Sequence, residues 1–115
     1  MSIQRFEPNG KRLSHVLVHN GIAYVTGQVP ADRSQDAAGQ TAQVLARIDD
    51  LLAKAGTDKS RILFAQVWLK HVVADFAAMN KAWEDWIPET ALPARATVEA
   101  NLAAENILVE IAVQA

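Results

Sequence analysis

Two amphipathic helical segments stand among five strand-like segments, and this imbalance limits what the chain can fold into. Apolar residues recur at steps of three and four over residues 41–55 and again over residues 75–87, as in helices with one buried face. Two helices are too few to cover both faces of a sheet of this size. We therefore expect an α+β fold in a single domain, residues 1–115, with a mixed sheet and both helices on one face.

The strand-like segments are recognised by alternation, by turn residues and by their β-branched and aromatic content. Asn20-Gly21 separates two of them, and this dipeptide favours the tight turn of a hairpin. The pattern also admits a short additional strand at residues 3–6, and the expected order is β-β-α-β-α-β-β. The five main strands are expected at residues 15–19, 22–26, 62–70, 94–100 and 107–113.

The ends of the two helices are marked by residues with terminal preferences. Gly56 is expected to end the first helix, because glycine enters the left-handed conformation without a steric penalty. Asp75 is expected to cap the second helix, and Pro88 is expected to end it.

Composition and charge narrow the classes of function. The formal net charge is −2, and no block of like charge predicts contact with nucleic acid or with an anionic membrane. The chain has no cysteine, which excludes disulfides, thiolate nucleophiles and cysteine zinc sites. No signal peptide is evident, and no apolar run approaches the roughly 20 residues that span a bilayer. We expect a cytoplasmic protein.

The face of the sheet away from the helices is expected to be an interface. Alternation places Phe64 and Trp68 on this face, and we expect Arg95 and Thr97 beside them. Such a surface is too apolar for bulk water and too charged for a private core. A contiguous patch of this kind indicates self-association. The alternatives are a loop folded over the face and a scatter of tolerated surface residues.

Few other residues offer chemistry. His15 and His19 are four residues apart on a predicted strand, about 13 Å, which is too far for both rings to bind one zinc ion. His71 stands alone, and Ser14 lacks the sequence context of a serine hydrolase nucleophile. We expect neither a metal nor a cofactor.

Arg95 and Glu110 are the strongest functional candidates. Glu110 interrupts an otherwise apolar strand, where a carboxylate is costly unless it has a cation or a wet cleft. Because the short segment 101–106 joins their two strands, we expect the two side chains to lie close together. They form either a structural ion pair at a subunit boundary or an anion site in which the guanidinium takes a carboxylate and the glutamate handles a water.

Several segments resemble the YjgF/RidA family, in the order of that family and over nearly the whole chain. The pairing of Pro-Ala-Arg with Val-Glu-Ile at matched spacing is the most specific feature. The short loop at residues 31–36 and the run Phe-Ala-Ala-Met-Asn-Lys-Ala-Trp are most similar to the YoaB-like branch. The matching segments are Thr26-Gly27-Gln28-Val29-Pro30, Gln40-Thr41 through Val44-Leu45, Asp75-Phe76-Ala77-Ala78-Met79-Asn80, Pro93-Ala94-Arg95-Ala96-Thr97-Val98 and Val109-Glu110-Ile111.

The resemblance implies a chorismate-mutase-like fold, a homotrimer and ligand clefts between neighbouring subunits. It also implies hydrolysis of reactive 2-imino or enamine acids to 2-oxo acids and ammonia, and therefore a small carboxylate-bearing metabolite as the ligand. Arg95 matches the carboxylate-binding arginine of the family, and Glu110 matches the acid that orients the attacking water. The resemblance further implies substrate-binding roles for Thr26, Gly27, Asn80 and Thr97.

One position departs from the family pattern. Leu13 stands where deaminases of the family place a cleft tyrosine, and loss of a hydroxyl typically costs about 1–3 kcal/mol if a buried partner is left unpaired. Imine hydrolysis is therefore expected to be slower, or directed to a different acid. The alternative function is a non-catalytic trimeric module that binds a small carboxylate at Arg95 for a regulatory or interaction role. Chorismate mutase activity would share only the architecture, and a fold does not determine a function.

Overall fold

The predicted Asn20-Gly21 hairpin is present at one side of the sheet. It joins β2 (Leu13–His19) to β3 (Ile22–Gln28), which pair in antiparallel fashion. The φ angles of Asn20 and Gly21 are 52° and 76°, as a type I′ turn requires. The additional strand also exists: β1 (Gln4–Asn9) pairs with β2 and forms the outer edge. The computed structural model describes residues 2–115.

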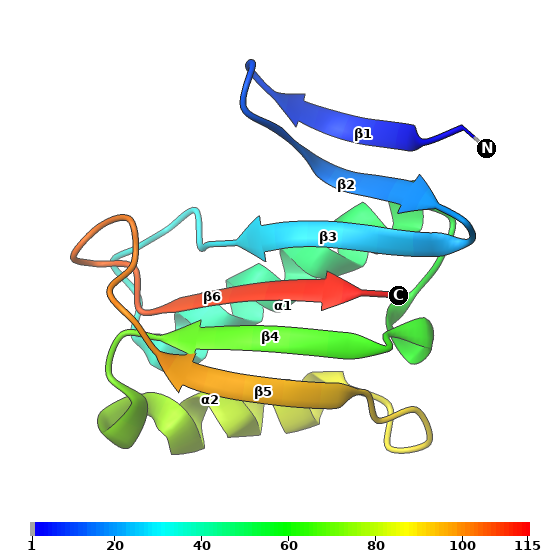
Figure 1. Ribbon diagram of the computed structural model, residues 1–115. Coiled ribbons are helices and arrows are strands. Elements are labelled where there is room, and N and C mark those ends of the chain that lie inside the picture. The colour runs from blue at the N-terminus through cyan, green and yellow to red at the C-terminus, as the bar shows by residue number, and fades with distance from the viewer. Residues whose placement is uncertain (1) are drawn as a thin grey trace.

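Six strands form one mixed sheet in the order β1-β2-β3-β6-β4-β5 (Figure 1). β4 (Phe64–Leu69) and β5 (Ala94–Glu99) run parallel, whereas every other neighbouring pair is antiparallel. β6 (Val109–Gln114) lies between β3 and β4. The expectation that the last two strands are neighbours was wrong, because the chain leaves β5, passes β4 and enters the sheet on the other side of it. In that central position Val109, Ile111 and Val113 are all buried.

A buried glutamine holds this crossing segment against α1 (Ala37–Lys54). Gln40 has no exposed surface. Its amide nitrogen donates to the carbonyl of Asn106 at 2.9 Å, and its amide oxygen accepts from the backbone nitrogen of Leu108 at 2.8 Å. Both sides of the amide are therefore satisfied, as buried polar groups require, and the chain is fixed where it turns into β6.

The first helix ends where the sequence predicts and begins four residues earlier. Asp36 caps its start and accepts from the backbone nitrogen of Gly39 at 3.0 Å. Gly56 follows its C-terminus with a φ of 81°. Thr57 donates to Leu52 at 2.9 Å and Gly56 donates to Ala53 at 3.0 Å, which together form a Schellman motif.

The second helix, α2 (Val72–Trp86), is capped from a distant strand. Asp75, the predicted cap, lies inside the first turn, and His71 at the N-cap position makes no side-chain capping bond. Instead the carboxylate of Glu99, at the end of β5, accepts from the backbone nitrogen of Val72 at 2.9 Å. A carboxylate there satisfies an orphan N–H and complements the helix dipole. α2 ends at Trp86, just before Pro88.

Both helices lie on one face of the sheet, as expected (Figure 1). α1 packs on β3 and β6, and α2 packs on α1 and β4. The strand expected at residues 62–70 starts only at Phe64. Before it, Ile62 is buried at 5% exposure and Leu63 is 57% exposed. No helix of residues 2–115 has the length and apolar character needed to cross a membrane.

The other face of the sheet, here called the open face, is covered by no element of residues 2–115. In β4 and β6 the rows that alternate with the buried residues face this side. Tyr24 on this face is 39% exposed and Val98 is 46% exposed. The open face carries Tyr24, Phe64, Gln66, Trp68, Ala94, Ala96, Val98, Glu110, Ala112 and Gln114.

Candidate ligand site in two halves

Arg95 faces the helices and not the open face. In the parallel pairing of β4 and β5, Arg95 lies in register with Ala65 and Thr97 lies in register with Val67. Ala65 and Val67 are completely buried beneath the helices, and residues in register share a face. The expectation that Arg95 and Thr97 lie beside Phe64 and Trp68 was therefore wrong.

The Arg95 guanidinium is held by three side chains of α2. Its Nη2 donates to the Asn80 Oδ1 at 2.6 Å, and its Nη1 lies 3.7 Å from the Met79 sulfur. The guanidinium carbon stands 5.2 Å from the ring centroid of Trp83, within cation–π distance. Arg95 is half-buried, and this desolvation lowers the pKa of its guanidinium, while the Glu84 carboxylate acts in the opposite direction.

Thr97 continues the row of Arg95 two residues along β5. Its hydroxyl is buried and has no hydrogen-bond partner within residues 2–115. Buried polar atoms are normally paired, so this hydroxyl is available to a group that enters beside it. Arg95, Asn80 and Thr97 thus lie in one region of the structure, and we call these three residues the arginine half-site.

The remaining predicted residues gather on the open face, around a bulge in β3. Val25 pairs with Val113 and Gln28 with Ile111, so Thr26 and Gly27 together oppose a single residue of β6. The Glu110 side chain packs directly on Gly27. A Cβ at position 27 would stand 2.9 Å from the Glu110 Cδ and still closer to its Oε2. Thr26, Gly27 and Glu110 form the second group, which we call the glutamate half-site.

Glu110 has no cation beside it in its own chain. It lies opposite Trp68 on the open face, and among residues 2–115 no ion pair involves it. Partial burial raises the pKa of its carboxyl group. Arg95 lies on the other face of the sheet, with β4 between the two strands. The expectation that Arg95 and Glu110 lie close together was therefore wrong within one chain.

Comparison with known proteins identifies the family. The profile described as "Endoribonuclease L-PSP" matches residues 3–115. A RutC family protein of Haemophilus influenzae is 48% identical over 114 residues, which cover 98% of this chain and 97% of that protein. The chain belongs to the endoribonuclease L-PSP family.

Other members confirm the resemblance to YjgF proteins and to their YoaB-like branch. The RutC family protein YoaB of Escherichia coli K12 is 44% identical over 115 residues, covering 100% of this chain and 98% of YoaB. A crystal structure of a YjgF family protein from Neisseria meningitidis has a TM-score of 0.95 and 41% identity. The match covers 100% of this chain and 94% of that one.

In this L-PSP family chain the sequence interpretation missed the role of one aromatic residue. Trp83 belongs to the helix core at 6% exposure, and its ring also supports the Arg95 guanidinium. Asn80 and Trp83 are three residues apart on a helix and so share a face. That spacing, next to a candidate binding asparagine, was the available signal. Leu13, at which the resemblance implies a tyrosine, stands at the start of β2 and is 41% exposed.

Replacement of Gly27 by alanine should displace the Glu110 carboxylate without breaking the strand, because φ at Gly27 is not in the left-handed region. We expect Gly27→Ala to lower the free energy of unfolding by about 1–2 kcal/mol. Most of this cost should vanish in a Glu110→Ala background, giving a coupling of about 1 kcal/mol in a double-mutant cycle measured by urea unfolding. Equal costs in both backgrounds would contradict the contact.

Replacement of Glu110 by glutamine should stabilise the fold at neutral pH. Because folding raises the carboxyl pKa, the native state loses stability as the pH rises through that pKa. Glutamine does not ionise, so Glu110→Gln should raise Tm by about 1–3 °C at pH 7. The gain should disappear near pH 4, where the carboxyl is protonated in both states. A gain of equal size at both pH values would show that ionisation is not its cause.

Proposed function

We propose that the chain is an enamine/imine deaminase that hydrolyses reactive 2-imino acids to 2-oxo acids and ammonia in clefts between the subunits of a homotrimer. The observation that carries the proposal is the division of the six candidate residues into two half-sites on opposite faces of the sheet. One half-site offers a cation for a carboxylate, and the other offers a carboxylate for a water. Neither half can perform the reaction without the other.

Assembly of several copies would bring the two half-sites together. The arginine half-site lies at the β5 edge, beside α2, and the glutamate half-site lies on the open face. If the β5–α2 edge of one subunit packs on the open face of the next, Arg95 of the first faces Glu110 of the second. This contact joins two different surfaces and is therefore heterologous, and such contacts generate a ring when the rotation between successive copies closes. The YjgF resemblance supports three subunits in that ring.

Arg95 would bind the substrate carboxylate. A guanidinium has five N–H donors in a planar fork, and the Asn80 bond occupies one side of it. Free N–H groups remain for a bidentate contact with a carboxylate, while the Trp83 ring and Asn80 hold the fork in place. Positioning of this kind converts an encounter into an oriented complex.

Glu110 would act on the attacking water. Its raised pKa brings the carboxyl closer to neutral pH, where it can take a proton from water and later release it. Water adds to the iminium carbon as Glu110 accepts one of its protons. Glu110 returns this proton to the nitrogen of the tetrahedral carbinolamine. The carbon–nitrogen bond then breaks and ammonia leaves, while the hydroxyl proton passes to Glu110 and the carbonyl forms. The iminium carbon is itself electrophilic, so these two residues supply the main groups that the reaction needs.

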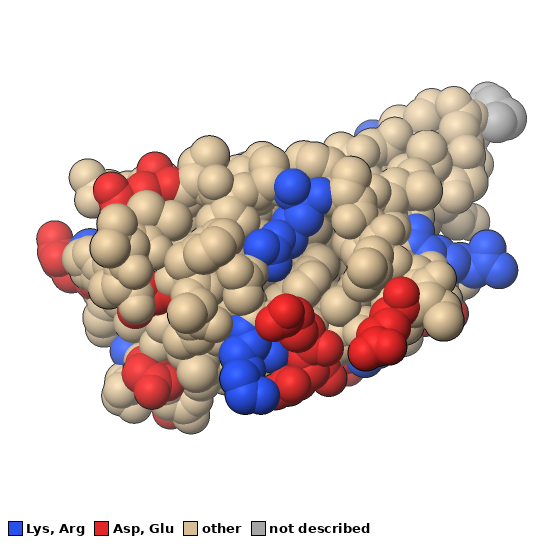
Figure 2. Space-filling model, turned by 90° about the horizontal axis from the view of Figure 1, so that it is seen from below, with Lys and Arg blue, Asp and Glu red and all other residues tan. Residues whose placement is uncertain are grey.

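The charge pattern supports a small acid as the ligand better than a nucleic acid. The description of the family names an endoribonuclease. On the face that Figure 2 shows, basic side chains lie among acidic ones, and the described residues of this face form no continuous basic surface. Binding along a phosphate backbone depends on several cations in a row. A single positioned guanidinium suits one carboxylate.

Mixed oligomers should reveal a site shared between subunits. Arg95→Ala and Glu110→Gln should each reduce hydrolysis of freshly generated 2-iminobutanoate by at least about 100-fold. After the two variants are unfolded together and refolded at equal amounts, about a quarter of the interfaces should pair an intact Arg95 with an intact Glu110. We therefore expect about a quarter of the wild-type rate per site.

Two outcomes would contradict this proposal, and Arg61→Ala, a change at an exposed residue distant from both half-sites, serves as the control. A wild-type rate no greater than that of Arg95→Ala would remove the enzymatic function. If a small carboxylate then still bound at Arg95 without turnover, the protein would be the non-catalytic binding module. Failure of the mixed oligomers to regain activity would place both residues in one chain.

The oligomeric state tests the assembly directly. Sedimentation velocity at micromolar concentration should give three times the chain mass of 12.5 kDa. Phe64→Glu places a charge on the open face and should shift the protein towards monomer. Ala53→Glu, on the exposed surface of α1, is the matched control and should leave the trimer intact. A stable wild-type monomer would refute the proposed cleft.

A further inference from the structure

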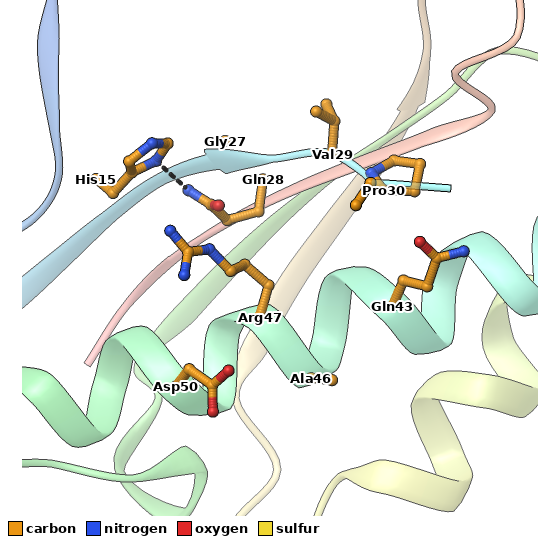
Figure 3. Close-up of a pocket in the computed structure, with 10 residues that line it drawn as sticks. His15, Gly27, Gln28, Val29, Pro30, Gln43, Ala46, Arg47 and Asp50 are labelled. Carbon is orange, nitrogen blue, oxygen red and sulfur yellow. Dashed lines mark hydrogen bonds between the residues drawn. The ribbon is translucent and has the colours of Figure 1, made fainter. Parts of the chain in front are cut away.

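A cavity lies behind β3, between the β2–β3 pair and α1 (Figure 3). Its volume is about 570 Å³, within the range of small-molecule sites. His15 and Gln28 form its strand side, and Arg47 and Asp50 of α1 form its helix side. None of the residues of the arginine half-site lines it. We call it the α1 groove.

The hydrogen bonds of Gln28 determine which nitrogen of His15 faces a ligand as a donor. The Gln28 amide nitrogen lies 3.1 Å from the Thr26 carbonyl oxygen, which can only accept, so the orientation of the amide is defined. The same nitrogen lies 3.1 Å from His15 Nδ1, which must therefore accept the second amide proton. The ring proton of the neutral imidazole is then on Nε2. His15, which borders the groove, thus carries its N–H donor on Nε2.

The two charges on the helix side are not paired with each other. Arg47 and Asp50 project from α1 three residues apart, yet within residues 2–115 neither belongs to an ion pair or to a side-chain hydrogen bond. The Arg47 guanidinium points towards Gln28 and His15 (Figure 3). A donor pair and a separate carboxylate therefore border the same cavity, and Val29 and Pro30 add an apolar wall.

We propose that the α1 groove binds a zwitterionic α-amino acid with a small apolar side chain. The ligand carboxylate binds Arg47 and the His15 Nε2–H, its ammonium group binds Asp50, and its side chain packs on Val29 and Pro30. A simple carboxylate fits less well, because it would meet Asp50 without a compensating cation. Glu7 also acts electrostatically on Arg47 and His15, but Lys54 already engages its carboxylate at 2.5 Å.

This site is independent of the proposed deaminase activity. Its ligand-binding side chains come from β2 and α1, whereas Arg95 and its partners come from β5 and α2. The groove approaches the glutamate half-site at Gly27, whose backbone borders the groove and whose open-face side contacts Glu110, and at the Thr26 carbonyl, which accepts from Gln28. Binding in the groove can therefore be measured in protein that lacks the arginine half-site.

The test is isothermal titration of full-length Arg95→Ala protein with L-alanine, L-valine and L-leucine. We expect saturable binding of at least one of them, and at least a tenfold loss of affinity in both Arg47→Gln and Asp50→Asn. Arg61→Gln, an exposed arginine outside the groove, is the matched control and should bind as the parent does. For the best amino acid, the acid without the amine and the amine without the carboxylate should each bind at least tenfold more weakly.

Each contrary result overturns a stated part of the proposal. No saturable binding of any of the three amino acids up to about 10 mM removes the site. Unchanged affinity in Arg47→Gln places the binding elsewhere. If the amine-free acid binds as well as the amino acid and Asp50→Asn has no effect, the groove is a plain anion site and the zwitterion is wrong. Circular dichroism of each variant confirms that the fold is retained.

Discussion

The parallel register of β4 and β5 is the constraint on which the functional geometry depends. Because Arg95 lies in register with the fully buried Ala65, its side chain must share the helix face. Glu110, opposite Trp68 in the antiparallel pair, must point the other way. A shift of one residue in either pairing would exchange the faces and put both charged groups on the same side. The separation of cation and carboxylate is thus a consequence of strand pairing, and it is the reason why the proposed site requires a second copy of the chain.

Local signals predicted most of the fold, and non-local pairing accounts for what they missed. Asn20-Gly21 and Gly56 require left-handed backbone, and both positions behave as predicted because their preferences are intrinsic. The order of β5 and β6 and the capping of α2 by Glu99 depend on residues distant in sequence. Glu99 lies 27 positions from the nitrogen that it caps. Sequence neighbours pair in only about two-thirds of cases, so the short segment after β5 was a weak argument for adjacency.

The candidate residues divide into two groups within one chain, and the sequence did not predict this arrangement. The Arg95 Nη2 donates to the Asn80 Oδ1 at 2.6 Å, and the Glu110 side chain packs on Gly27. Each half-site therefore contains residues for which the resemblance implied a role. Alternation within one strand gives two rows but does not say which row faces the helices. For β5 the choice requires a partner strand of known orientation. In the structure Ala94 and Ala96 lie on the open face, and Arg95 packs between the strand and α2.

The glutamate half-site also shows why function and stability oppose each other in this fold. A carboxylate on a sheet face, packed on Gly27 and without a cation, pays a desolvation cost that an uncharged residue would avoid. The same desolvation raises the pKa of the Glu110 carboxyl group and makes the ionised carboxylate a stronger proton acceptor. Gly27 permits the close packing because any side chain there would push the carboxylate away. The bulge that places Thr26 and Gly27 opposite one residue of β6 is therefore needed for the proposed chemistry, although it interrupts the regular pairing of β3 with β6.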